Sequence, residues 1–165
     1  MTVLAPLFNA PLAVQLHVAG VGLAILLLPL TLWRRRRDRV HRMAGYAWVG
    51  AMGLAALSSF FIHGLALVGP FGPIHLISVY VLWGLFMGVR AAIRGQQTTH
   101  RDPMRGLAFG GLGVAGMLSF LPGRMMNDMV FGPHGTEGFW ALAAIAVLVL
   151  VRRGVRGKGA NRSAA

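Results

Sequence analysis

An arginine-rich stretch between two long apolar segments limits the possible folds of this chain more than any other feature. Residues 33–46 read Trp-Arg-Arg-Arg-Arg-Asp-Arg-Val-His-Arg-Met-Ala-Gly-Tyr, and six arginines there face a single acid, Asp38. A soluble core cannot bury such a block, and a bilayer cannot pass it. We therefore interpret the stretch as an interfacial turn between two membrane spans. Because short arginine-rich loops face the cytoplasm, it also predicts the orientation of the chain.

The composition also indicates a membrane protein. Hydrophobic residues make up 56% of the chain and charged residues only 12%, whereas soluble domains carry about a quarter charged residues. A net charge of +12 would suggest nucleic acid in a soluble protein. Here the basic residues lie at the ends of apolar runs, so orientation and contact with anionic lipid explain them, and we expect no nucleic-acid partner. The absence of cysteine excludes disulfides and thiolate metal sites.

Hydropathy predicts an all-α polytopic transmembrane bundle in one domain over residues 1–151, followed by a basic cytoplasmic tail at 152–165. A span needs about 20 apolar residues, and the last apolar run is the shortest. Polar connections are expected at residues 94–105 and 124–138. The five expected spans cover about residues 12–33, 43–68, 74–93, 106–121 and 136–151.

The basic residues predict an outer N-terminus and an inner C-terminus. With five spans, 15 of the 16 Lys and Arg residues lie on the inner side and only Arg124 lies outside. Four spans would place the basic tail outside and spoil this asymmetry. We expect the first span to be retained, because it is too long for a signal-peptide core and is followed by a stop-transfer block. The predicted location is the bacterial inner membrane, with several passes.

Histidines are the candidate ligands of this chain, because ionisable residues within a membrane indicate function by default. His17 and His63 each lie about five residues from the outer end of a span, roughly 8 Å deep. His75 lies near the same surface. His41 and His100 lie at the inner surface, and His134 falls in an outer connection.

Two histidines at matched depth on different helices are what a b-type haem requires. His17 with His63 is the best-matched pair. His41 and His63 are 22 residues apart, about 33 Å along one helix, so a haem near His41 and His100 would be a second centre. Alternatively, the histidines are neutral and hydrogen-bonded to backbone carbonyls or serines, and the inner two touch lipid phosphate.

Small residues recur at helical spacing in two predicted spans. Ala47, Ala51, Ala55 and Ser59 form one stripe, and Gly106 with Gly110 forms a second pair. Such stripes favour close helix packing in membranes; a flat cofactor against the stripe is the alternative. No acid lies within a span, which disfavours a carboxylate-coupled transporter.

Three stretches carry a resemblance to a known family. They are His17-Val-Ala-Gly20 with the apolar run to Arg34, His41-Arg42-x-x-Gly45, and His100-Arg101-x-x-Met104. Together they resemble domain of unknown function 2306, a family of predicted bacterial membrane proteins. The resemblance marks these positions: His17, His41, Arg42, Gly45, His100, Arg101 and Met104.

The family resemblance implies no known activity, and two positions depart from its pattern. Tyr46 directly follows Gly45 where the family has arginine, and Pro103 stands where tryptophan is expected. The histidine-bearing helices are also distantly similar to cytochrome b-561-type proteins. The leading hypothesis is therefore a haem-b electron-transfer protein. The alternative is a non-catalytic subunit or scaffold that packs against a larger membrane complex or a second copy of itself.

Overall fold

The computed structural model describes residues 4–34, 37–62, 72–132, 135–141 and 144, and every regular element within these ranges is helical. The chain divides into two compact units, residues 4–116 and a second unit that begins at Met117 and includes residues 1–3. The elements are α1 (Ala5–Phe8), α2 (Leu12–Leu28), η1 (Pro29–Trp33), α3 (Arg39–Ser59), α4 (Pro73–Ile93), α5 (Gln97–Gly106), η2 (Leu107–Gly113), α6 (Val114–Ser119) and α7 (Met125–Phe131).

The first long helix joins α2 to the π-helical segment η1. Pro29 has no N–H to continue the α-helical ladder, and the wider π-helical backbone begins there. The Thr31 hydroxyl donates to the carbonyls of Leu27 (3.1 Å) and Leu28 (3.2 Å). The combined helix covers the 22 residues Leu12–Trp33, which are the predicted bounds of the first apolar helix. An 18-residue window within it has a mean hydropathy of 2.0.

Helix α3 begins and ends earlier than the sequence predicted. Asp38 caps it by accepting the backbone N–H of His41 at 3.1 Å, so the polar first turn belongs to the helix. The helix ends at Ser59, whereas the predicted span covered residues 43–68, of which 63–68 lie outside the described residues. Hydropathy misses a charged first turn because the cap, not the apolar content, determines where this helix starts.

Helix α4 agrees with its predicted span, 74–93, to within one residue. Pro73 occupies its first position, where the missing N–H would have no intrahelical partner. It has 21 residues, and an 18-residue window within it has a mean hydropathy of 1.8. Within the described ranges, α2 with η1 and α4 are the two helices long and apolar enough to cross a bilayer.

The prediction of a polar loop at residues 94–105 is wrong over most of that range. Gly95, with φ of +71°, turns the chain, and α5 then runs from Gln97 to Gly106 with Pro103 inside it. Met104 is the buried residue of α5, and most of the other residues of this helix are polar. Hydropathy averaged over the segment therefore identifies it as polar. In the second unit, α7 lies within the expected connection 124–138, and most of the predicted span 136–151 lies outside the described residues.

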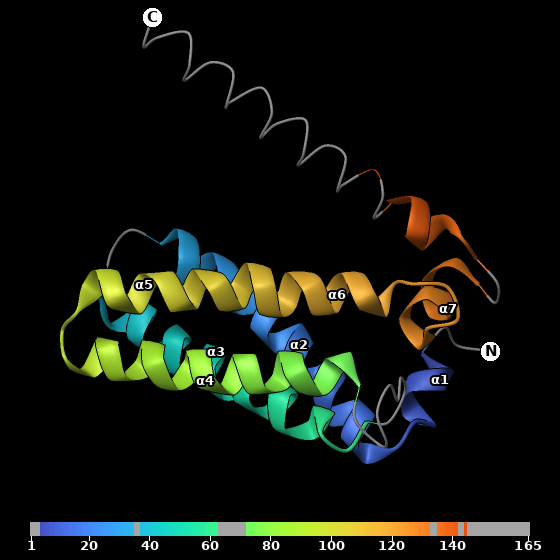
Figure 1. The fold of residues 1–165 in the computed structure, drawn as a ribbon, viewed down its shortest axis with the longest axis horizontal. Helices are drawn as coiled ribbons and strands as arrows, with labels where there is room; N and C mark the ends of the chain where they lie inside the picture. The colour runs from blue at the N-terminus through green and yellow to red at the C-terminus, as the bar shows by residue number, and fades with distance from the viewer. Residues whose placement is uncertain (1–3, 35–36, 63–71, 133–134, 142–143, 145–165) are drawn as a thin grey trace, which may run out of the picture. The chain divides into compact units, whose positions relative to one another are not determined.

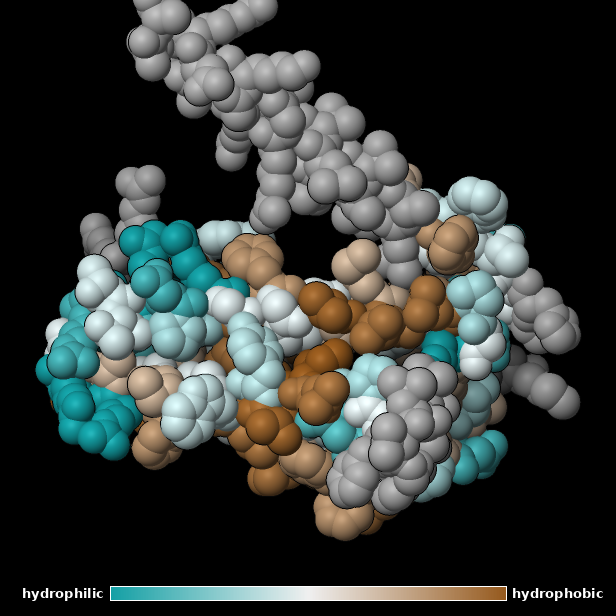
Figure 2. Space-filling model, in the orientation of Figure 1, coloured by the Kyte–Doolittle hydropathy of each residue, from teal (hydrophilic) through white to brown (hydrophobic). Residues whose placement is uncertain are grey.

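In residues 4–116, α2 packs on α3, α3 on α4, and α4 on α5 and η2 (Figure 1). The core contains Trp48, Met52, Leu85 and Leu107. Large apolar side chains also cover the outside, as Figure 2 shows by the hydrophobic surface along the middle of these helices. Hydrophilic residues gather instead where α4 turns into α5. This distribution suits helices whose outer faces contact lipid.

The small-residue stripe on α3 packs against Gly20 of α2. A Cβ atom at Gly20 would lie 2.8 Å from the Ala51 carbonyl oxygen and 3.1 Å from the Ala55 nitrogen. The two backbones are therefore in direct contact, which confirms the close-packing interpretation at Ala51 and Ala55. No space for a flat cofactor remains between α2 and α3 at this level.

A buried serine pair links α3 to α4. The hydroxyls of Ser59 and Ser78 are hydrogen-bonded to each other, and Ser59 is fully buried. We expect Ser59→Ala to lower the free energy of unfolding by about 1 kcal/mol, because hydrogen bonds between membrane helices are individually modest. Thermal unfolding in detergent measures this effect. Ser58→Ala is the control, since the Ser58 hydroxyl donates within its own helix, to Ala55 at 3.1 Å; equal effects of both variants would contradict the prediction.

Candidate ligand site: a histidine-lined cavity

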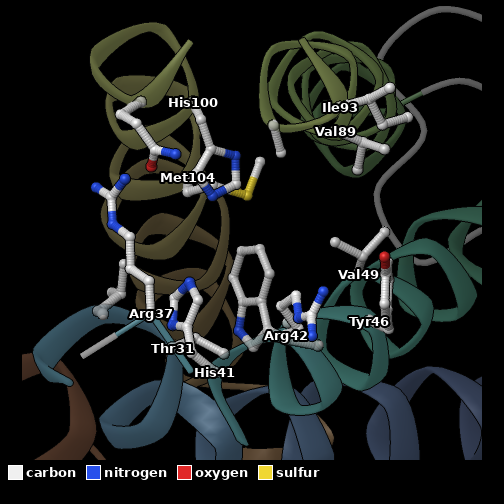
Figure 3. A pocket seen from close by; sticks show the side chains of 15 residues that line it. Thr31, Arg37, His41, Arg42, Tyr46, Val49, Val89, Ile93, His100 and Met104 are labelled. Atoms are coloured by element: carbon white, nitrogen blue, oxygen red, sulfur yellow. The ribbon is translucent and has the colours of Figure 1, made fainter. Parts of the chain in front are cut away.

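A cavity of about 360 Å³ lies between η1, α3, α4 and α5, at the end of the unit that carries the arginine-rich stretch. Figure 3 shows His41, on α3, and His100 and Met104, on α5, pointing toward it. The structure thus brings the two histidine motifs together. The lining residues are Thr31, Leu32, Arg37, His41, Arg42, Gly45, Tyr46, Trp48, Val49, Val89, Ala92, Ile93, Gln97, His100 and Met104.

The orientation of His100 is fixed by a hydrogen bond to the backbone of α4. Its Nδ1 lies 2.8 Å from the Gly88 carbonyl oxygen. Because a carbonyl only accepts, Nδ1 carries a proton, and in the neutral imidazole Nε2 is then the nitrogen with the lone pair. Histidines that bind metals are commonly held in this way, with one ring nitrogen donating to a carbonyl and the other free for the ligand.

Gly88 also lets α5 approach α4 closely. A Cβ atom at this position would overlap the end of the Met104 side chain. Met104 lies one helical turn after His100 and is 7% exposed. The absence of a side chain at Gly88 therefore positions both the imidazole and the thioether beside the cavity.

Two polar atoms at the cavity are buried without a hydrogen-bond partner. They are Nδ1 of His41 and Nε1 of Trp48, and Trp48 as a whole is only 2% exposed. The two residues are seven positions apart on α3 and so share a face. An unpartnered buried polar group costs about 1–3 kcal/mol and is uncommon in folded proteins. The two unpaired polar groups therefore lie within the wall of the cavity.

The rest of the lining combines open space, apolar walls and positive charge. A Cβ atom at Gly45 would meet no atom within 4 Å, so this motif glycine leaves room in the cavity. Val49 and Val89 form part of an apolar wall. Arg37 and Arg42 bring guanidinium groups to the same space (Figure 3). Such a lining suits a flat apolar molecule that carries acidic groups.

Asp38 holds the arginine-rich turn in place beside the cavity. Its carboxylate accepts from the Arg34 guanidinium, with one contact from Arg34 Nε at 3.2 Å, and from the His41 backbone N–H. The hydrogen bond from Arg34, and after it that from His41, lowers the pKa of Asp38 to about 2. The pKa of Arg34 is raised by the same pair. The carboxylate is therefore charged throughout the physiological range.

This lowered pKa predicts a pH dependence of stability. A carboxyl group whose pKa is lower in the folded protein stabilises the fold above its unfolded pKa, here 3.8. That contribution is lost as the pH falls toward about 2. We expect Asp38→Asn to lower the melting temperature at pH 6 and to flatten its dependence on pH below 4, relative to the native chain. Melting curves from neutral to acidic pH check this; parallel curves for the two proteins would contradict it.

The predicted site residues fall in different places. The cavity is lined by His41, Arg42, Gly45, His100 and Met104. Arg101 lines an overlapping cavity, to which His41, His100 and Met104 also belong. His17 lies away from both cavities, with Nδ1 donating to the Ala55 carbonyl at 2.8 Å. His75, in the first turn of α4, accepts the Gly72 N–H at its Nδ1 (3.1 Å) and so helps to cap this helix. His63 lies outside the described residues.

Sequence reasoning missed two residues that matter here. Trp48 could have been found from its position two helical turns after His41, on the same face. Gly88 had no signal in the sequence, because its role depends on the contact between α4 and α5. Within the described ranges, no group of three or more histidine or acidic side chains comes together, so these residues form no multi-ligand metal site of the zinc type.

The fold and the cavity define a class: an α-helical membrane protein with a histidine-lined cavity between its helices. Within that class, the chain belongs to the family described as predicted membrane protein (DUF2306), whose sequence model matches residues 14–152. No similar protein of curated function and no similar solved structure was found. The distant similarity to cytochrome b-561-type proteins is not shown by these comparisons and stays a prediction.

Proposed function

We propose that this protein is a five-span protein of the bacterial inner membrane that binds haem b between His41 and His100 and carries electrons. The observation that carries the proposal is the convergence of these two motif histidines, from α3 and α5, on one cavity. The N-terminus lies outside and the C-terminus inside, which agrees with the distribution of Lys and Arg. The cavity then opens near the cytoplasmic surface.

The residues of the cavity fit this cofactor. The imidazoles of His41 and His100 would ligate the iron, and the Nε2 of His100 would be the ligand atom because Nδ1 donates to Gly88. Arg37 and Arg42 would pair with the propionates, and the apolar walls would contact the porphyrin. When bound, haem supplies one-electron chemistry. The protein positions the ligands and limits the access of water.

This proposal moves the favoured pair away from His17 and His63. His17 Nδ1 donates to the Ala55 carbonyl, and α2 packs directly on α3 beside it. The structure describes His17 but not His63, so it supports no ligand pair at the outer end. The contact at Gly20 favours a structural role for His17.

The first experiment is an absorption spectrum of the protein purified in mild detergent from cells supplied with haem. The oxidised and dithionite-reduced forms are compared, and haem is quantified by the pyridine haemochrome. We expect a reduced α-band and about one haem per chain, as a single ligand pair requires. A featureless spectrum with adequate protein would overturn the proposal.

A scaffold role is the second candidate, and large exposed apolar side chains favour it. Leu26 on α2 is 75% exposed and Trp83 on α4 is 64% exposed. In a bilayer these faces contact lipid or another membrane protein. A colourless protein that copurifies in fixed ratio with a larger membrane complex would support this candidate over haem binding.

A further inference from the structure

A second cavity, of about 630 Å³, overlaps the histidine-lined one and is strongly cationic. The two cavities share Thr31, Leu32, Arg37, His41, His100 and Met104, and the second adds Trp33, Arg34, Arg101 and Arg105. Arg34 and Arg37 reach it from the arginine-rich stretch. Arg101 and Arg105 reach it from α5, where their spacing of four places them on one face. Two parts of the chain that are distant in sequence therefore bring four guanidinium groups around one space.

The positive charge of this cavity is largely uncompensated. Arg34 is paired with Asp38. Arg37, Arg101 and Arg105 form no ion pair with any acid in the part of the chain that the structure describes. Asp102 follows Arg101 on α5 but pairs with none of the four. Like charges held close together repel, so an anion bound among them would stabilise the arrangement.

The apolar part of the lining indicates the kind of anion. Leu32 and Met104 line the same cavity, and Trp33 beside them is 73% exposed. Tryptophan and arginine at the end of an apolar helix are typical of the membrane interface. A molecule that fits must therefore carry a negative group for the arginines and apolar chains that extend along the helix into the bilayer.

We propose that this cavity binds the phosphate group of an anionic phospholipid. Guanidinium groups match phosphate oxygens in geometry and charge, and basic pockets between membrane helices bind lipid headgroups. The acyl chains would lie against Trp33 and the outside of α2. This inference needs only the membrane location and no bound haem, and three of the four arginines, Arg34, Arg101 and Arg105, line this cavity and not the histidine-lined one.

The test is native mass spectrometry of the protein exchanged into mixed micelles with equal amounts of phosphatidylglycerol and phosphatidylcholine. We expect the native chain to retain phosphatidylglycerol selectively. The double variant R101Q/R105Q should lose about tenfold in retention, because each basic residue near anionic lipid contributes substantially to binding. The matched control is R90Q/R94Q, which removes the same charge from the nearby end of α4, where Arg90 and Arg94 line a different cavity. The control should change by less than about twofold.

Three outcomes separate the possible explanations. Equal losses in both double variants would mean diffuse attraction and would overturn the site. Competitive displacement of phosphatidylglycerol by inorganic phosphate would mean a free-anion site and would overturn the lipid assignment. Selective loss in R101Q/R105Q, with no displacement by inorganic phosphate, would support it. The absorption spectrum of the same samples reports haem independently, so failure of one proposal is distinguishable from failure of the other.

Discussion

His41→Ala and His100→Ala should each reduce the haem content of the purified protein by about tenfold or more, because each removes one ligand of the proposed pair. The expected loss follows from the cavity that both residues line and from the free Nε2 of His100. Haem per chain, measured from the reduced spectrum and normalised to protein, is the quantity to compare. Size-exclusion profiles establish that each variant remains folded.

His17→Ala is the matched control for these two variants. It removes a histidine that bonds to the Ala55 carbonyl and lines neither of the two cavities at the arginine-rich end. We expect it to keep its haem while losing some stability. The reverse pattern, with haem lost in His17→Ala and kept in the other two, would contradict the inner site and restore the outer ligand pair.

Gly45→Leu tests the same cavity without removing a ligand. Gly45 lines the cavity, and a side chain added there would meet no neighbouring atom within 4 Å. The leucine should therefore occupy the cavity and exclude haem while the helices remain folded. Gly50→Leu is its control. Gly50 also has no atom within 4 Å of an added Cβ and does not line the cavity. Equal haem contents in the two leucine variants would contradict the assignment.

Gly20→Ala should have the largest effect on stability among the glycine-to-alanine changes on α2 and α3. The new Cβ would lie 2.8 Å from the Ala51 carbonyl oxygen, which belongs to a backbone that cannot move aside without shifting α3. Overpacking of this kind lowers the free energy of unfolding by about 1–3 kcal/mol. The midpoint of thermal or denaturant unfolding in detergent provides the measurement.

Gly22→Ala separates this contact from the general effect of replacing glycine in a helix. No atom lies within 4 Å of a Cβ at Gly22, and alanine favours a helix over glycine by up to about 1 kcal/mol. We therefore expect Gly22→Ala to be neutral or stabilising. A destabilisation as large as that of Gly20→Ala would mean that close contact of α2 with α3 is not the cause.

Several residues of the candidate site could be identified from the sequence, but the cavity in which they meet could not. His41 and His100 were identified by their motifs and grouped at the inner surface by their depth. Trp48, which lines the cavity, and Gly88, which positions His100, were not identified, because the sequence shows the first as an ordinary apolar residue and the second as an ordinary small one. The preference for His17 with His63 came from matched depth alone. Depth does not reveal that α2 and α3 touch at Gly20 and leave no space between them.

The sequence by itself determined the membrane class, the all-helical fold and the bounds of the helices at Leu12–Trp33 and Pro73–Ile93. These follow from apolar content and local charge, which are properties of neighbouring residues. Tertiary structure decided that α5 extends to Gln97, that His100 bonds to Gly88, and that two distant motifs share one cavity. Such features depend on which helix faces pack together, and hydropathy averaged along the chain contains no information about that pairing.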